Sequence, residues 1–502
     1  MNRLRSLNLI HFRKLSCNET KVTQDWLLNC LYLPLQQLNE FKRRRSEMAT
    51  KQTKRLFLTL LLGSFTMFLN QTLLNTAYPS LMKDLSVSTD YVQWLTTGFL
   101  LVTAVVIPLS GWLLHQINAK YLYSLSQVIF LAGTILCSIA GSFSQLLFGR
   151  VIQAIGVGIA MPLFQTVLLY LSPKNKRGTI MGIAGIVIGL APAIGPSLSG
   201  FILTKYDWHV LFLMLIPIIL VVLILTVCFM QPVLPIRRTK LDCLSVIESS
   251  LGLGLLLSGL SLISAKHANK SLLGASIVLG SVFIYRFVRR QKKLANPFLS
   301  LEPFKQKEYV ISCILLAIAN MAMISFEMVI PMYIQNIRAL SPLESGLSLL
   351  PGALVLGIMS PISGKLFDKY GAKGLSIVGM SFLTVFTFLF VFIQATTPMA
   401  LIITFYAFRL FGISMVLMPV TTFGMNALPN TELGDASVIN KTTKQVASSL
   451  GTAVMISVMT LITNTSSHSK TLLAGYHGSF YVASFFCIIA LVLSFKLPKH
   501  AA

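Results

Sequence analysis

Four ionisable residues stand inside long apolar stretches of this chain and are its first candidates for chemistry: Glu327, Arg150, Arg409 and Glu248. An ionisable side chain is costly within a membrane, so each is a candidate for function. Glu327 lies in the apolar run 323–331, and apolar surroundings favour the neutral form of a carboxylic acid. Glu327 is therefore a candidate to take up and release a proton. The competing interpretation is a structural pairing with an arginine or a position that faces water.

Arg150 falls near the start of its apolar stretch, and we expect it beside Gln153 on a polar cleft. An arginine there could exchange partners with a proton-carrying acid, or it could be a static hydrogen-bonded strut to the first apolar stretch. The sequence leaves both interpretations open, and Arg409 has the same two. Glu248 lies near the start of its stretch, at what we expect to be its inner end, close to the membrane surface.

The elements that must position these residues are membrane helices. Hydrophobic residues make up 54% of the 502 and charged residues only 11%, whereas soluble domains carry roughly 25% charged residues. From Leu56 onward, apolar runs of about 20 residues recur, long enough to cross a bilayer. The pattern predicts an all-α, polytopic membrane protein with fourteen spans, centred near Phe65, Thr103, Leu131, Gly158, Leu190, Leu220, Leu255, Val278, Ala322, Leu356, Val385, Leu410, Val454 and Ile488.

The net charge of +25 indicates the orientation of these spans rather than a nucleic-acid partner. One set of alternate loops holds most of the loop lysines and arginines, and we place Lys441 and Lys444 in that set. Basic loops lie in the cytoplasm, and an even number of spans puts both termini there as well. The seven cysteines form no C-x-x-C pair, so no metal site is expected.

An internal repeat divides the chain. Residues 108–120 align without gaps to residues 361–373, with six identities at a constant offset of 253. Two parallel six-helix halves with this relation are typical of a transporter. We therefore predict four regions. Residues 1–47 form a cytoplasmic extension that is either functional or dispensable to the mature fold. A six-helix bundle over 48–230, two inserted helices over 231–308 and a second six-helix bundle over 309–502 follow.

The predicted fifth span carries small residues along one side, which let transmembrane helices approach closely. One interpretation is an ordinary kinked helix, and the other is a packing seam on which two helix bundles rock. The residues of this seam are Gly185, Gly189, Ala191, Gly195, Pro196 and Gly200.

Several motifs occur together in a fixed order. Gly195-Pro196 followed by Gly200 resembles the antiporter motif of the major facilitator superfamily, with Ala191 and Ser199 at two of its glycine positions. Residues 150–156 resemble the family's span-four motif, and residues 364–373 its cytoplasmic gate motif. The first-half copy of the gate departs from the pattern at His115 and Gln116. In the span-one motif, Asn70 stands where many relatives carry Asp.

Over residues 56–497 the chain resembles the fourteen-span drug:proton antiporters of this superfamily, of the lincomycin-resistance type. The resemblance implies two six-helix bundles with two inserted helices, and export of amphipathic drug-like molecules in exchange for protons. It implies no cofactor, since the proton gradient supplies the energy, and a functional unit that is a monomer in the lipid bilayer of the plasma membrane. The cytoplasmic gate would comprise Gly111, Gly364, Asp368, Gly371 and Lys373.

Asp368 could hold the gate shut by pairing with a basic side chain or by facing a helix N-terminus; the competing interpretation is a solvated loop acid. Depth along spans one, four, nine and twelve gives the candidates for a substrate cavity: Asn70, Gln71, Asn75, Tyr78, Gln153, Gln165, Asn320, Phe326 and Met415.

Other functions stay open at this point. A dedicated exporter of one physiological solute, or a non-transporting receptor or assembly subunit, would share the fold. The chain has no H-E-x-x-H and no Walker A motif, which argues against a membrane metalloenzyme and against direct use of ATP.

Overall fold

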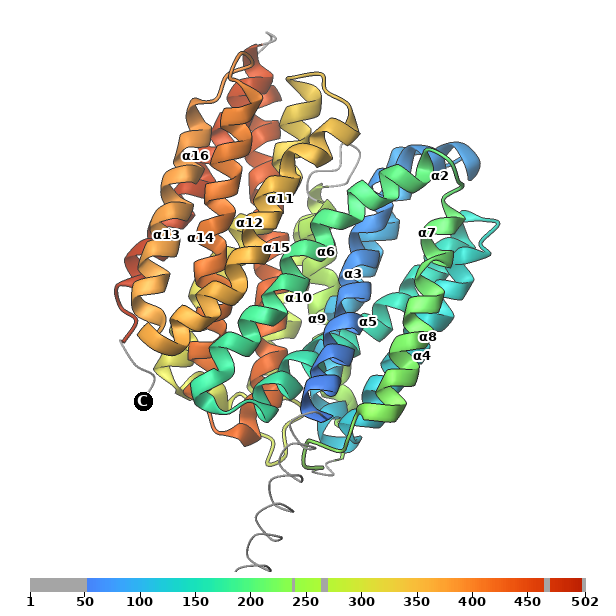
Figure 1. Ribbon diagram of the computed structural model, residues 1–502, viewed down its shortest axis with the longest axis vertical. Helices are drawn as coiled ribbons and strands as arrows, with labels where there is room; N and C mark the ends of the chain where they lie inside the picture. Colours follow the sequence, from blue (N-terminus) through green and yellow to red (C-terminus); the bar gives the residue numbers. More distant parts are fainter. Residues whose placement is uncertain (1–51, 237–239, 263–269, 465–469, 499–502) are drawn as a thin grey trace, which may run out of the picture. The chain divides into compact units, whose positions relative to one another are not determined.

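A computed structural model of the chain describes residues 52–236, 240–262, 270–464 and 470–498. These residues form helices and no strands (Figure 1). In the described ranges, 14 helices are long and apolar enough to cross a membrane, and each contains one predicted centre. The prediction of an all-α, fourteen-span protein is confirmed. The predicted extension, residues 1–47, lies outside the described residues.

In the first six spans, α5 is the helix against which α3 and α4 pack. The short α2 (Tyr78–Asp84) lies between spans one and two. The close approach of α4 to α5 depends on glycine, because a Cβ added to Gly156 would lie only 2.7 Å from the Ser126 carbonyl oxygen. These six spans are helix Gln52–Leu73, α3 (Thr89–Gln116), α4 (Ala119–Ser138), α5 (Phe143–Leu171), α6 (Arg177–Leu203) and α7–α8 (His209–Leu213 and Leu215–Phe229).

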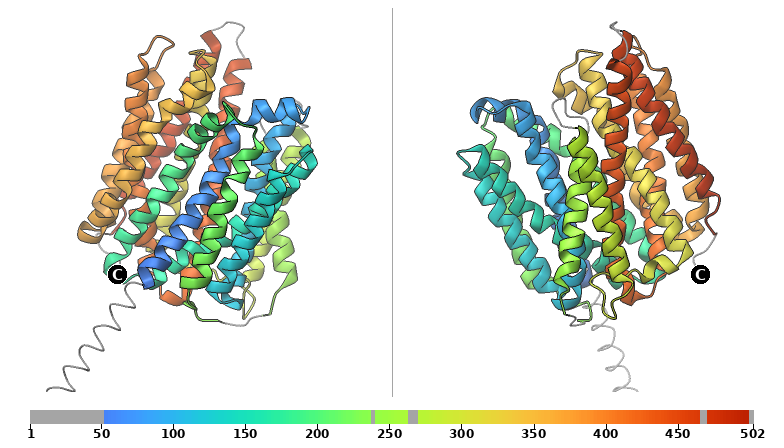
Figure 2. Two further views of the ribbon diagram at one scale, coloured as in Figure 1. Left: turned by 45° about the vertical axis from the view of Figure 1, so that its right-hand side comes forward. Right: turned by 180° about the vertical axis from the view of Figure 1, so that it is seen from behind.

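The last six spans repeat this plan. Here α13 packs on α14, and a Cβ added to Gly379 would lie 2.6 Å from the Gly412 carbonyl oxygen. Their bounds are α11 (Lys307–Asn336), α12 (Pro342–Tyr370), α13 (Ala372–Leu389), α14 (Met399–Asn426), α15 (Leu433–Asn464) and α16 (Lys470–Ser494). Between the halves come α9 (Cys243–Leu262) and α10 (Lys270–Gln291), which pack on each other (Figure 2).

Two kinds of helix contact join the halves. The first is α6 against α12 and α14, and the second is α15 against α3 and α5. At the end of α12, Gly371 adopts a φ of 79°, a left-handed value that favours glycine. This turn leads directly into α13.

Candidate functional site

A buried arginine organises the first half. The Arg150 side chain has no exposed surface. Its Nε donates to the Leu95 carbonyl oxygen at 3.2 Å, and its Nη1 donates to the Asn70 carbonyl oxygen at 3.4 Å and to Gln153 Oε1 at 2.9 Å. Its guanidinium carbon lies 4.2 Å from the centre of the Phe99 ring. Arg150 thus joins spans one, two and four inside the bundle.

The amides of Asn70 and Gln153 complete this cluster. Asn70 Nδ2 donates to Gln153 Oε1 at 3.2 Å, and Gln153 Nε2 donates to Thr134 Oγ1 at 2.9 Å. Both amides are fully buried. The two predicted cavity residues, Asn70 and Gln153, therefore bind each other and Arg150 within the first half.

A second buried arginine occupies the matching place in the second half. Arg409 Nε donates to Thr387 Oγ1 at 3.0 Å, and Nη2 donates to the Ala322 carbonyl oxygen. Its guanidinium carbon lies 3.7 Å from the centre of the Phe326 ring. Phe326 is fully buried. It was predicted to line a cavity, but it packs inside the bundle, because depth along a helix does not specify which face a residue occupies.

The two arginine clusters share more than their arginines. Thr134 on α4 and Thr387 on α13 are separated by 253 positions, the offset of the repeat in the sequence. Gln153 links Arg150 to Thr134, whereas Arg409 bonds Thr387 directly. Each arginine also bonds a backbone carbonyl of the first span in its half, through Asn70 and Ala322. The internal repeat thus extends to the polar contacts inside the bundles.

Glu327 follows Phe326 on α11 and differs from the arginines in its environment. Its side chain is half-buried, and no hydrogen bond or ion pair with another described residue satisfies its carboxylate. It interacts electrostatically with Arg409 and with Tyr406. Nη1 of Arg409 is buried without a hydrogen-bond partner in the described part of the chain. Glu327 therefore has as its electrostatic neighbour a buried arginine that retains one unused donor.

Asp368 lies at the junction of the two halves. Its Oδ1 accepts a hydrogen bond from the Gly178 backbone N–H at 2.8 Å. Its Oδ2 accepts from Thr179 N–H at 2.8 Å and from Thr179 Oγ1 at 2.6 Å. These donors form the first turn of α6, where the helix dipole favours a negative charge. Of the two partners expected for Asp368, the structure shows the helix N-terminus.

Other gate residues differ in what they contact. A Cβ added to Gly364 would overlap the Gly178 carbonyl oxygen, and one added to Gly111 would lie 3.2 Å from Val438 of α15. Both glycines thus stand where the halves meet. Lys373 makes no ion pair with any other described residue.

The first-half counterpart of the Asp368 contact has a different chemistry. His115 Nε2 lies 3.4 Å from Asp435 Oδ1, in the first turn of α15. Nearby, Arg177 donates from Nη1 to Asn426 Oδ1 at 3.0 Å and from Nη2 to Asn430 Oδ1 at 2.7 Å. Polar contacts thus join the halves at the end where α6 and α15 begin.

The small residues of α6 divide between two faces. A Cβ added to Gly185 would lie 2.7 Å from Ser360 Cβ, and one added to Gly189 would lie 2.9 Å from Leu356 Cγ, both on α12. A Cβ added to Gly195 would instead overlap Thr72 of span one, in its own half. Six residues at 3.6 per turn rotate Gly195 by about 120° from Gly189. Gly195 was predicted on the inter-bundle seam, and the structure places it inside the first bundle.

Ala191 is fully buried on α6, while Pro196 and Gly200 are half-buried. The remaining predicted cavity residues are dispersed. Tyr78 donates to Thr96 Oγ1 at 2.6 Å. Asn320 Nδ2 donates to the Lys444 carbonyl oxygen at 3.2 Å. Gln71 is half-buried, Gln165 and Met415 are buried, and the side chain of Asn75 lies outside the described part.

Two lysines were misplaced by the sequence analysis. Lys441 and Lys444 were assigned to a basic loop, but both lie inside α15. The polar composition of the first turns of α15 hid the helix, which begins at Leu433. Glu248 was expected near the membrane surface. It is buried and accepts a hydrogen bond from Arg286 Nε at 3.2 Å, which pairs α9 with α10.

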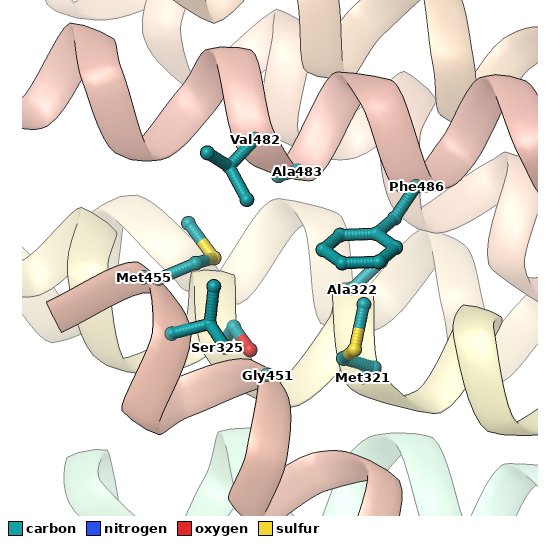
Figure 3. Close-up of a pocket in the computed structure, with 9 residues that line it drawn as sticks. Met321, Ala322, Ser325, Gly451, Met455, Val482, Ala483 and Phe486 are labelled. Atoms are coloured by element: carbon teal, nitrogen blue, oxygen red, sulfur yellow. The ribbon is translucent and has the colours of Figure 1, made fainter. Parts of the chain in front are cut away.

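A small pocket lies inside the second half between α11, α15 and α16 (Figure 3). Its lining is apolar except for Ser325, and none of the predicted cavity residues contributes to it. The lining residues are Met321, Ala322, Ser325, Gly451, Val454, Met455, Val482, Ala483 and Phe486. This pocket is a packing gap and contains no ionisable group.

Comparison with known proteins agrees with this architecture. Residues 60–452 match the family model described as Major Facilitator Superfamily. The chain is 39% identical to the uncharacterized MFS-type transporter YcnB of Bacillus subtilis (strain 168), over 88% of this chain and 94% of that protein. It is 36% identical to the lincomycin resistance protein LmrB of the same organism, over 88% of this chain and 95% of that protein.

Among solved structures, the proton:xylose symporter XylE superposes with a TM-score of 0.64 at 15% identity, covering 90% of this chain and 97% of that one. At that identity the likeness concerns the fold alone. The family model and the two Bacillus relatives, together with the fourteen spans, show that this chain belongs to the Major Facilitator Superfamily of membrane transporters.

Proposed function

We propose that the protein exports amphipathic drug-like molecules across the plasma membrane in exchange for protons. The likeness to a lincomycin resistance protein over nearly the whole of both chains supports export of drug-like compounds. No cofactor takes part in this proposal, because the proton gradient drives the exchange, and the monomer is the functional unit.

The orientation follows from the basic loops. The end at which α6 and α15 begin would face the cytoplasm, with both termini on that side. The contacts of Asp368, Arg177 and His115 would then close the cytoplasmic end in the state described here. Alternating access requires these contacts to break when the protein opens inward.

The electrostatic interaction of Glu327 with Arg409 carries the proposal. A protonated Glu327 is neutral and needs no cationic partner. An ionised Glu327 is stabilised by turning to the free Nη1 of Arg409, and a charge-assisted hydrogen bond of this kind contributes about 1.5–3 kcal/mol. Proton uptake and release at Glu327 would therefore favour different packing of α11 against α14, which couples the proton to the bundle motion.

The test is efflux of an amphipathic dye from cells that express the full chain, with and without a protonophore. We expect efflux that stops when the protonophore dissipates the gradient. Efflux that continues unchanged without a proton gradient would reject proton coupling.

A further inference from the structure

Two lysines share one face of α15. Lys441 and Lys444 are three residues apart, a spacing that places side chains next to each other on a helix. They lie in the polar first turns of a helix, Asn430–Thr463, whose later part is apolar and long enough to span a membrane. Both side chains are half-buried. Two like charges this close in a membrane protein are costly, so they are candidates for function.

The surroundings of the lysines place them where the halves meet. Lys444 Nζ donates to Thr421 Oγ1 of α14 at 3.3 Å. Lys441 Nζ lies 5.6 Å from the centre of the Phe68 ring, which belongs to the first span. A hydroxyl group and the face of an aromatic ring offset only part of the cost of burying a charged ammonium group. Within the described residues, neither lysine has a carboxylate partner.

Unused polar atoms occur nearby. The side chains of Asn440 and Gln165 are buried, and Asn440 Oδ1 and Gln165 Nε2 have no hydrogen-bond partner in the described ranges. Asn440 precedes Lys441 on α15, and α15 packs against α5, which carries Gln165.

We propose that Lys441 and Lys444 bind the acidic group of the transported molecule, so that the substrates are amphipathic organic anions with a carboxylate or phosphate on an apolar body. This inference rests on the proposed export function and specifies its substrate class. The anion supplies the negative charge that the protein does not place beside the lysines. The neighbouring helix α5 offers a further buried hydrogen-bond donor, Nε2 of Gln165, which has no partner in the described ranges.

Two xanthene dyes of similar shape and opposite charge test the proposal: carboxyfluorescein as the anion and rhodamine 123 as the cation. Binding to the purified full-length protein is measured by fluorescence anisotropy. We expect Lys441→Gln and Lys444→Gln each to weaken carboxyfluorescein binding by about tenfold or more, since hydrogen bonds to charged groups contribute about 1.5–3 kcal/mol. Lys444→Arg should retain most of the affinity, because it keeps the charge.

Lys307→Gln is the matched control, because Lys307 is exposed at the start of α11, and it should bind carboxyfluorescein like the unaltered protein. An unaltered protein that binds no anionic dye overturns the inference. Equal loss of binding for both dyes in the lysine variants also overturns it, because it indicates a general structural role.

Dye export separates this inference from the proposed function. If carboxyfluorescein binding depends on the lysines but a protonophore does not reduce dye export, the anion site is supported and proton exchange is rejected. If a protonophore stops the export of rhodamine 123 but the protein binds no anionic dye, proton exchange is supported and the anion site is rejected.

Discussion

Asp368 accepts two hydrogen bonds from Thr179, at 2.8 Å from the backbone nitrogen and 2.6 Å from Oγ1. The acid lies in the last turn of α12 in the second bundle, and the threonine lies in the first turn of α6 in the first. This contact therefore joins the two bodies that must separate if the protein works by alternating access. It lies at one end of the face on which Gly185 and Gly189 pack against α12.

We expect Asp368→Asn to slow dye efflux by about tenfold or more. The amide has the size of the acid but loses the charge that the α6 N-terminus stabilises, and a hydrogen bond to a charged group contributes about 1.5–3 kcal/mol. The measurement is the initial efflux rate at matched protein level in the membrane. Glu302→Gln, in an exposed ion pair with Lys305, is the control. An Asp368→Asn protein with the normal rate would count against the gate.

A larger side chain on the face of α6 that packs against α12 should block transport. Gly185→Leu is expected to abolish transport, because even a Cβ there would lie 2.7 Å from Ser360. Gly374→Leu on α13 is the control, since a Cβ at Gly374 meets nothing within 4 Å. The measurement is efflux together with the amount of folded protein by size-exclusion chromatography. Normal turnover by Gly185→Leu would show that close packing of α6 on α12 is not needed for the cycle.

The matched threonines should contribute to stability in both bundles. Thr387→Val leaves Arg409 Nε without its partner, and Thr134→Val removes the hydroxyl that orients Gln153. A buried donor left unsatisfied costs about 1–3 kcal/mol, so we expect both variants to melt at lower temperature in detergent. Thr404→Val, at an exposed position, should melt like the unaltered protein. A melting temperature unchanged in Thr387→Val would indicate that Arg409 is held by its other contacts.

The ion pair between Asp242, just before α9, and Arg290 of α10 should contribute the same stability at every pH used in transport assays. Arg290 donates two hydrogen bonds to Asp242 and lowers the pKa of that carboxyl to about 2. A depressed pKa stabilises the folded state above the ordinary carboxyl pKa of about 4, and this contribution is lost only as the pH falls toward 2. The difference in melting temperature between Asp242→Asn and the unaltered protein should therefore be constant from pH 5.5 to 8. A difference that varies across this range would contradict the assignment.

The architecture could be predicted from the sequence, because span length, apolar composition and the repeat offset of 253 are properties of the sequence itself and do not depend on packing. The sequence also identified Asp368, since the gate motif recurs at a helix end. The helix face on which a residue lies could not be predicted in the same way, because rotation about a helix axis depends on packing. Phe326 and Gly195 have the predicted depth but point into their own bundles. Lys441 was not predicted to lie on a helix, because the polar first turns of α15 have the hydropathy of a loop. The Pro-Asn turn that precedes Leu433 is a sequence signal that could have indicated the start of this helix.

Proton movement through Glu327 is the central claim, and proteoliposomes that hold a pH-sensitive dye test it most directly. Addition of a transported substrate to vesicles with the unaltered protein should drive protons in the opposite direction. Glu327→Gln should abolish this substrate-dependent proton signal while the protein still folds and binds substrate, and Glu308→Gln on the same helix should preserve it. A full proton signal from Glu327→Gln would contradict the account and place the proton site elsewhere.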